Sequence, residues 1–273
     1  MNTARSHDGT PIAYEKSGEG PPLLLVDGAL CHRASGPSRP LAAELASRFT
    51  VYTYDRRGRG DSGDTAPYSV DREVEDIEAL IEEAGGSAHV YGISSGAVLA
   101  LEAAAHGAAI QSLALYEPPF IVDASRAPMP DDYRDRVEHL VAAGKPGDAV
   151  KMFMRNVGVP RALVALMGLM PMFKRLKAVA HTLAYDAAVM GDTQSGRPLP
   201  RTRWSEVTTP TLVIAGGKSP AWLHAGAEEL ADIVPGAESR VLAGQTHMVK
   251  AKVLAPMLAD WFGQRAVRPR STV

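Results

Sequence analysis

The stretch His89–Val98, HVYGISSGAV, decides the fold, because it places two serines between two glycines where an apolar run meets an Ala-rich run. A tight turn from a strand into a helix leaves almost no room for side chains two residues before and two residues after its tip. For Ser94 those positions are Gly92 and Gly96, whereas for Ser95 one of them is an isoleucine. The spacing therefore predicts Ser94 as a nucleophile on a strand–serine–helix turn.

The second serine has a different expected role. Ser95 would begin the helix, so its backbone N–H would point to where negative charge develops on a substrate oxygen. The alternative interpretation is a Gly/Ser-rich loop without chemistry, because a short G-x-S-x-G motif is weak on its own. The preceding strand and the following helix favour the nucleophile.

The bulk composition is typical of a globular protein that handles a small molecule. The chain has 273 residues, which suits one large α/β domain with an insertion. A formal net charge of −2 gives no overall field for nucleic acid or anionic lipid, so we expect no nucleic acid and no membrane as partners. The single cysteine and the lack of an apolar secretory segment at the start predict a cytoplasmic protein. The sequence leaves open whether the protein forms a homo-oligomer.

Short apolar runs alternate with segments of helical periodicity, which is typical of a parallel sheet covered on both faces. The expected strands are 3–7, 11–16, the run PPLLLVDG at 21–28, 50–54, 88–92, 112–116, 211–215 and 240–242. The expected helices are one capped by Ser69, then 97–106, 220–233 and 251–262.

The alternation stops between 118 and 204, where helical pieces and prolines occur without a clear strand. We therefore expect a helical insertion at 118–204, with a core formed by 1–117 and 205–273. Large apolar residues crowd the insertion: Met152, Phe153, Leu163, Leu166, Met167, Met170, Met172 and Phe173. They would line a substrate pocket or form an ordinary helix-packing core.

The motif order resembles that of the α/β-hydrolase superfamily over nearly the whole chain. VDGAL, YDRRGRGDS, YGISSGA, the helical insertion, TLVIAGG and GQTH follow one another as they do in that family. The resemblance implies a mostly parallel eight-stranded sheet with helices on both faces and a helical lid inserted after the sixth strand. It also implies His247 as the catalytic base, and the backbone N–H groups of Ala29 and Ser95 as the oxyanion hole.

The loop that would carry Ala29 departs from the family pattern. Asp27 stands where the family usually has a histidine, and a carboxylate aimed at the oxyanion hole would oppose the developing charge. We therefore expect Asp27 to point away and to bond loop backbone. Cys31 and His32 fit a pocket wall or loop packing better than chemistry. The loop YDRRGRGDS implies that Arg57 or Arg59 ties neighbouring loops together.

The usual acid is also missing. The family places an aspartate shortly after the seventh strand, but this chain has the uncharged Ser219 there. Glu117, at the end of the sixth strand, could reach His247 from the neighbouring strand and supply the carboxylate. In the alternative, Glu117 braces the hinge of the insertion and the site works as a Ser–His dyad.

These features predict a cofactor-free serine hydrolase for a small or medium apolar ester, lactone or thioester, with Ser94, His247 and Glu117 as its catalytic residues. A carbon–carbon bond hydrolase, a cyclase or lyase, and a non-catalytic binder of a small ligand are alternatives on the same fold. The histidine spacing and the single cysteine indicate that there is no metal site. The sequence also lacks a phosphate-binding loop, so we expect no cofactor.

Overall fold

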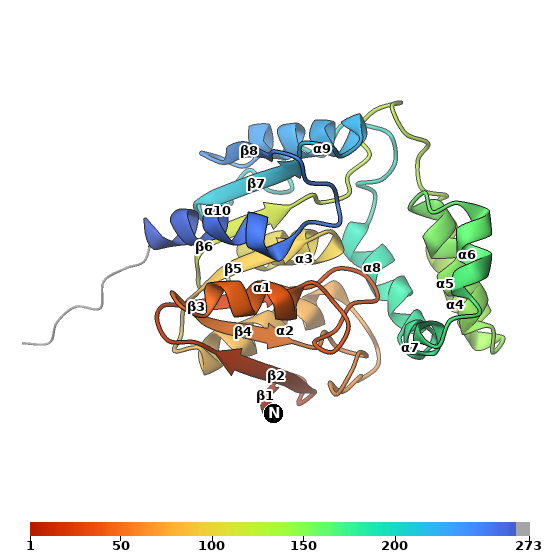
Figure 1. Cartoon of the computed structure of the whole chain (residues 1–273), viewed down its shortest axis with the longest axis horizontal. Coiled ribbons are helices and arrows are strands. Elements are labelled where there is room, and N and C mark those ends of the chain that lie inside the picture. Colours follow the sequence, from red (N-terminus) through yellow and green to blue (C-terminus); the bar gives the residue numbers. More distant parts are fainter. Residues whose placement is uncertain (266–273) are drawn as a thin grey trace, which may run out of the picture.

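Eight strands form one sheet in the computed structural model, which describes residues 1–265 (Figure 1). The strand order is β1-β2-β4-β3-β5-β6-β7-β8; the β1–β2 and β2–β4 pairs are antiparallel and the remaining pairs are parallel. The strands are β1 (Asn2–Arg5), β2 (Pro11–Ser17), β3 (Pro22–Val26), β4 (Thr50–Tyr54), β5 (Ala88–Ile93), β6 (Ile110–Tyr116), β7 (Thr211–Gly216) and β8 (Glu238–Leu242). This is the sheet expected from the sequence.

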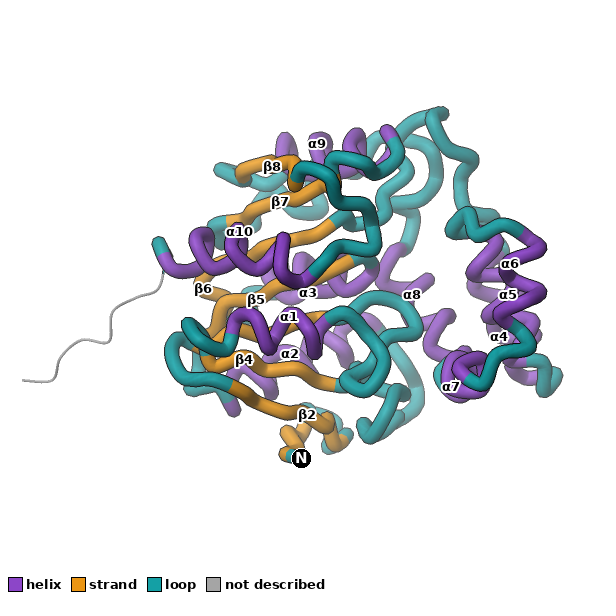
Figure 2. The backbone as a smooth tube through the Cα atoms, in the orientation of Figure 1, coloured by secondary structure: helices purple, strands orange, loops and turns teal. Residues whose placement is uncertain are grey.

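Helices cover both faces of the sheet (Figure 2). One apolar cluster packs the sheet against α2 (Val70–Glu83), α3 (Ser95–Ala105) and α9 (Ala221–Ile233). A second cluster packs the other face against α1 (Ser38–Leu45) and α10 (Ala251–Gly263). Every residue of β5 and of β7 is buried, because parallel strands between two helical layers have no face in water.

The stretch after β6 forms a helical cap. Its elements are α4 (Tyr133–Ala142), α5 (Pro146–Asn156), α6 (Arg161–Met167), α7 (Met172–Ala178), the 3-10 turn η1 (Ala180–Thr182) and α8 (Leu183–Met190). Figure 1 shows α4–α7 beyond the ends of the strands, with α8 between them and the sheet. The cap has an apolar cluster of its own, which includes Leu30 from the loop after β3.

Some local expectations were wrong or incomplete. Helix α1 was not expected, because it is only eight residues long and Pro37 and Pro40 punctuate its start. Ser69 does lie at the N-cap of α2, but its side chain makes no capping hydrogen bond. The last part of the expected core, 266–273, lies outside the described residues.

The apolar residues of the insertion divide into two groups. Phe173 is buried, and Met152, Phe153 and Met167 pack against the cap cluster. The others are exposed and so do not belong to a packed core: Leu163, Leu166, Met170 and Met172. Sequence periodicity marks an apolar face, but it does not say whether another element covers that face.

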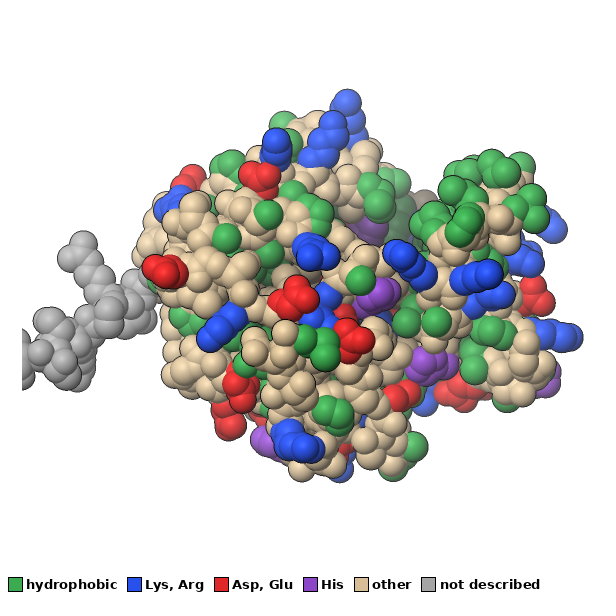
Figure 3. Space-filling model, turned by 60° about the horizontal axis from the view of Figure 1, so that its bottom comes forward, with side chains coloured by type: hydrophobic (Ala, Val, Ile, Leu, Met, Phe, Trp, Pro, Cys, Tyr) green, Lys and Arg blue, Asp and Glu red, His purple; other side chains and the backbone are tan. Residues whose placement is uncertain are grey.

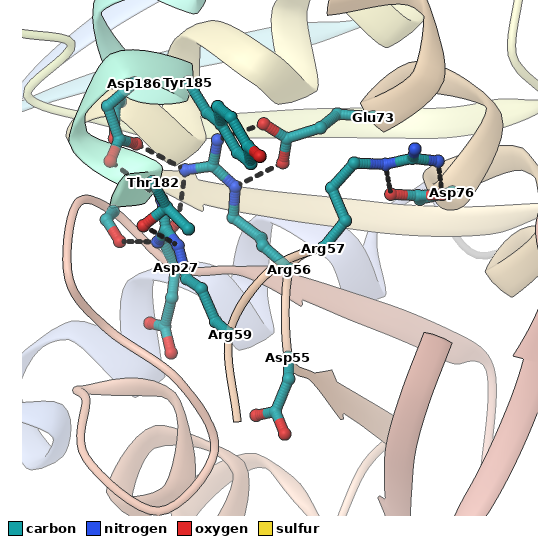
Figure 4. A network of polar contacts seen from close by, with 12 residues as sticks. Asp27, Asp55, Arg56, Arg57, Arg59, Glu73, Asp76, Thr182, Tyr185 and Asp186 are labelled. Atoms are coloured by element: carbon teal, nitrogen blue, oxygen red, sulfur yellow. Dashed lines mark hydrogen bonds and ion pairs between the residues drawn. The ribbon is translucent and has the colours of Figure 1, made fainter. Parts of the chain in front are cut away.

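A buried ionic network attaches the cap to the core (Figure 4). Asp186 on α8 accepts from Arg56 through Oδ1 and from Arg59 through Oδ2, each at 2.8 Å. Arg56 also makes two contacts of 2.7 Å with Glu73 on α2. The Ser95 hydroxyl donates to Asp186 Oδ1 at 2.7 Å. The carboxylate therefore joins the cap, the loop after β4 and the start of α3.

We expect Asp186→Asn to lower the free energy of unfolding by about 3 kcal/mol, because two buried guanidinium groups lose their shared counter-charge. Urea unfolding of the variant and the wild type measures the change. Asp232→Asn is the control, since Asp232 is exposed and makes no ion pair among the described residues. Equal stability of Asp186→Asn and the wild type would contradict this role.

Candidate functional site

The turn after β5 holds Ser94 in a strained conformation. Its backbone has φ 58° and ψ −130°, a conformation that residues other than glycine rarely adopt. A Cβ at Gly92 would lie 2.5 Å from the Gly96 carbonyl oxygen, and a Cβ at Gly96 would lie 2.6 Å from the Asp27 carbonyl oxygen. Both flanking positions must be glycine, as the spacing argument requires, and the turn presents Ser94 half-buried.

The loop after β3 lies directly against Ser94. A Cβ at Gly28 would be 2.9 Å from Ser94 Cβ, so glycine permits this close approach. Arg59 holds the loop by donating to the Gly28 carbonyl at 2.6 Å. In the described part of the chain, the N–H groups of Ala29 and Ser95 donate to no other backbone group. Both N–H groups therefore remain available for a substrate oxygen.

Glu117 and His247 meet on the same side of the sheet. Glu117 Oε2 lies 2.8 Å from His247 Nδ1, and Glu117 Oε1 accepts from the Gly216 N–H at 2.6 Å. Glu117 is fully buried. Burial alone would raise its pKa, but the hydrogen bonds from His247 and Gly216, together with the nearby Ser219 hydroxyl, hold the pKa below its usual value. The group is therefore a carboxylate at neutral pH.

Ser219 lies close to this carboxylate without replacing it. Its hydroxyl is buried and has no hydrogen-bond partner of good geometry within residues 1–265. It nevertheless lies near enough to Glu117 to lower the pKa of that carboxyl. Tyr116 was missed from the sequence: its hydroxyl donates to the Thr246 carbonyl at 2.7 Å and braces the loop of His247. The position of Tyr116 directly before Glu117 was the sequence feature that could have indicated a role at the site.

Backbone strain gathers around these groups. Of the described non-glycine residues, only Leu30, Ser94 and Glu117 have positive φ. They belong to the loop after β3, the serine turn and the end of β6. Such strain persists where the surrounding structure imposes it and is common at active sites.

Other expected residues have clear positions. Asp27 does not bond loop backbone as expected; Ser38 donates to its carboxylate at 2.6 Å, because α1 brings that hydroxyl to the loop. Arg59 ties the Gly28 loop to α8, as expected of one of the two arginines. Burial raises the pKa of Cys31 to about 12, so its thiol is unreactive at neutral pH.

Several site groups are not joined directly. Ser94 and His247 make no hydrogen bond with each other within residues 1–265. Such contacts are often long without substrate. His247 is 39% exposed, so substrate can reach its ring. His32 pairs with Ser35 in a backbone bridge. No group of three or more possible metal ligands occurs in the described residues.

The buried Asp27 generates a pH-dependent prediction. Burial raises the pKa of Asp27 to about 6 in the folded chain, against an ordinary value of 3.8. The folded state therefore binds this proton more tightly, and the wild type loses stability as the pH rises through that interval. We expect the stability of Asp27→Asn minus that of the wild type to increase by about 3 kcal/mol between acidic and neutral pH. Urea unfolding of both proteins across the range measures this difference, in which titrations shared by both proteins cancel; a constant difference would contradict the prediction.

The chain is similar to known proteins in sequence and in structure. The model of the alpha/beta hydrolase family matches residues 25–257. The chain is 53% identical to an alpha/beta hydrolase structure from Sphaerobacter thermophilus, with a TM-score of 0.88, covering 96% of this chain and 100% of that one.

Two curated proteins match shorter stretches. The uncharacterized hydrolase YraK of Bacillus subtilis is 36% identical over 34% of this chain and 35% of its own length. The N-formylmaleamate deformylase of Pseudomonas putida is 38% identical over 37% of this chain and 39% of its own length. The chain thus matches little more than a third of each.

More distant structures, between 16% and 22% identical, include an esterase, an enol-lactonase and a meta-cleavage product hydrolase, and they show the fold alone. None of the helices within residues 1–265 combines the length and hydropathy needed to cross a bilayer. On the extent of the family match, together with the serine turn and the sheet order, the chain belongs to the alpha/beta hydrolase family.

Proposed function

We propose that this hydrolase cleaves a small or medium apolar ester, lactone or thioester through an acyl-enzyme on Ser94, without a cofactor. The observation that carries the proposal is the contact between His247 and the buried Glu117 carboxylate. A surface histidine has no need of a fully buried partner, whereas a catalytic base does, because it must accept a full charge during the reaction.

Each group has one role in the proposed reaction. His247 takes the proton of the Ser94 hydroxyl as its Oγ attacks the acyl carbon, and the N–H groups of Ala29 and Ser95 stabilise the oxyanion. Glu117 stabilises the imidazolium. The imidazolium then protonates the leaving oxygen or sulfur, and water, activated by the same ring, hydrolyses the acyl-enzyme.

The apolar substrate class rests on the cap. The cap cluster combines helices of the insertion with Leu30, and Ala29 packs against the same cluster. An apolar group bound beside the oxyanion loop would therefore meet hydrocarbon from the cap, which favours burial of an acyl or alcohol chain.

One similarity favours a second substrate class. The stretch shared with the N-formylmaleamate deformylase supports an N-formyl amide as an alternative to an ester. Carbon–carbon bond cleavage, cyclase or lyase chemistry, and ligand binding without turnover remain alternatives on this fold. A panel of p-nitrophenyl esters, lactones, thioesters and N-formyl amides, run beside fluorophosphonate labelling, separates these classes. A serine that neither labels nor turns over any substrate would support the binding protein.

We expect Ser94→Ala to lower kcat by about 10³-fold or more and to abolish fluorophosphonate labelling, because the nucleophile is lost. Ser95→Ala is the matched control. It keeps its backbone N–H but loses the hydrogen bond to Asp186, so we expect kcat within about tenfold of the wild type and about 1–2 kcal/mol less stability. Hydrolysis and labelling of both variants measure the difference; an active Ser94→Ala enzyme would overturn the nucleophile.

We expect Glu117→Gln to lower kcat by about 10²- to 10⁴-fold with little loss of fold, because a neutral amide does not stabilise the imidazolium. Ser219→Ala should stay within about tenfold of the wild type, since no charge is lost. Steady-state kinetics of both variants, with circular dichroism as the control for folding, measure the effect. A Glu117→Gln enzyme of normal rate would favour a Ser–His dyad. Partial recovery of kcat in the double variant Glu117→Gln with Ser219→Asp would indicate that a carboxylate at either position can serve His247.

A further inference from the structure

Apolar side chains gather on the outside of the cap. Ten large hydrophobic side chains are exposed in the described residues, and six of them lie between 157 and 172: Val157, Leu163, Leu166, Leu169, Met170 and Met172. Leu169 is 84% exposed. Figure 3 shows hydrophobic side chains clustered on the lobe at the right, which is the cap. Single exposed hydrophobic residues are ordinary, but a cluster of this kind marks an interaction surface.

The same segment is strongly basic. Between 145 and 178 the chain has one acidic residue, Asp148, and seven basic ones: Lys145, Lys151, Arg155, Arg161, Lys174, Arg175 and Lys177. Of these seven, only Lys151 forms an ion pair in the described part of the chain, with Asp148 at 3.2 Å. We call the exposed side chains of 145–178 the outer cap surface.

This charge is local. The whole chain has 31 acidic residues and 29 Lys and Arg residues, so the rest of the molecule is more acidic than this surface. At the adjacent helix α4, Glu138 pairs with Arg134 at 2.9 Å and the N-cap residue Asp132 pairs with Arg136 at 2.7 Å. Asp131 and Asp135 form no ion pair within residues 1–265, so negative charge also lies beside the outer cap surface. The net charge of the chain therefore conceals a local basic and apolar surface, although the chain as a whole has no strong overall field.

A groove between α5 and α6 combines both properties. It has a volume of 420 Å³, with Lys151, Arg155 and Arg161 among its lining residues and Val164 and Leu169 as apolar lining. Cations around an apolar floor suit a ligand with an anionic head and a hydrocarbon tail. Leu163 and Leu166 are three residues apart on α6 and so share one face of that helix.

We propose that the outer cap surface docks on an anionic lipid surface. Leu163, Leu166 and Leu169 enter the boundary between headgroups and acyl chains, while the arginines and lysines around them contact lipid phosphates. Basic helices with one apolar face bind at membrane interfaces in this way without crossing the bilayer. The proposal concerns where the enzyme binds and is independent of the bond that it cleaves.

Co-sedimentation with vesicles tests the proposal on the full chain. We expect the wild type to bind vesicles of phosphatidylcholine and phosphatidylglycerol in equal parts, to bind pure phosphatidylcholine weakly, and to dissociate at high salt as the charges are screened. Leu166→Ser with Leu169→Ser, and Arg161→Glu with Arg175→Glu, should each reduce partitioning by about tenfold or more. Both pairs are exposed, and thermal melting at the wild-type temperature verifies their fold.

Matched controls lie on the core. Val241→Ser removes an exposed apolar side chain from β8, and Arg39→Glu reverses an exposed charge on α1. Both should bind anionic vesicles as the wild type does. No binding of the wild type to anionic vesicles at low salt, or an equal loss in the controls, would overturn the proposal. Self-association in sedimentation velocity that is lost in Leu166→Ser with Leu169→Ser, without vesicle binding, would assign the surface to a second copy and overturn it as well.

Discussion

Two buried guanidinium groups share one carboxylate, and the site depends on that arrangement. Arg56 and Arg59 cannot lose their protons in a protein, so Asp186 must stay beside them if they are to remain buried. The same carboxylate accepts from Ser95 at the start of α3, and Arg59 also holds the Gly28 carbonyl. The cap helix α8, the serine turn and the loop after β3 are therefore fixed to one another, and displacement of α8 would separate buried opposite charges.

The sheet explains how Glu117 can replace the acid of the neighbouring strand. In the register of the parallel strands, Ile93 lies beside Tyr116, and Tyr116 beside Ile214. Glu117 therefore follows β6 at the level where Ser94 follows β5. The backbone reinforces this position: Ser94 N–H donates to the Tyr116 carbonyl at 3.0 Å. Glu117 is fully buried there, which strengthens the interaction of its carboxylate with an imidazolium.

The two sides of the cap face different environments. Its inner side contributes to the apolar cluster that includes Leu30 from the loop after β3. Its outer side leaves Leu166 and Leu169 exposed among basic side chains, of which only Lys151 forms an ion pair within residues 1–265. Burying apolar surface would normally remove such side chains from water, and their exposure in an otherwise well-packed chain is the reason for assigning this side to an interface.

Much of the fold and part of the candidate site follow from sequence because their causes are local. The Gly92-x-Ser94-x-Gly96 spacing identifies Ser94 without a structure, and the clash at Gly92 is with the turn itself, although the carbonyl groups that crowd Gly96 belong to Val26 and Asp27. Apolar runs identify the strands, since a strand buried on both faces is mostly apolar. The proximity of Glu117 to His247 could be anticipated because the carboxyl ends of neighbouring parallel strands meet at one edge.

Other features required the tertiary structure. Asp186 lies 91 residues from Ser95, and nothing in the local pattern around it distinguishes it from a surface carboxylate on a helix. Ser38 became the partner of Asp27 only through the placement of α1. Leu163 and Leu166 of α6 have the spacing of a packed face, yet no other element within residues 1–265 buries them. Local spacing depends on a few consecutive residues, whereas partners and coverage depend on which distant segments the folded chain brings together.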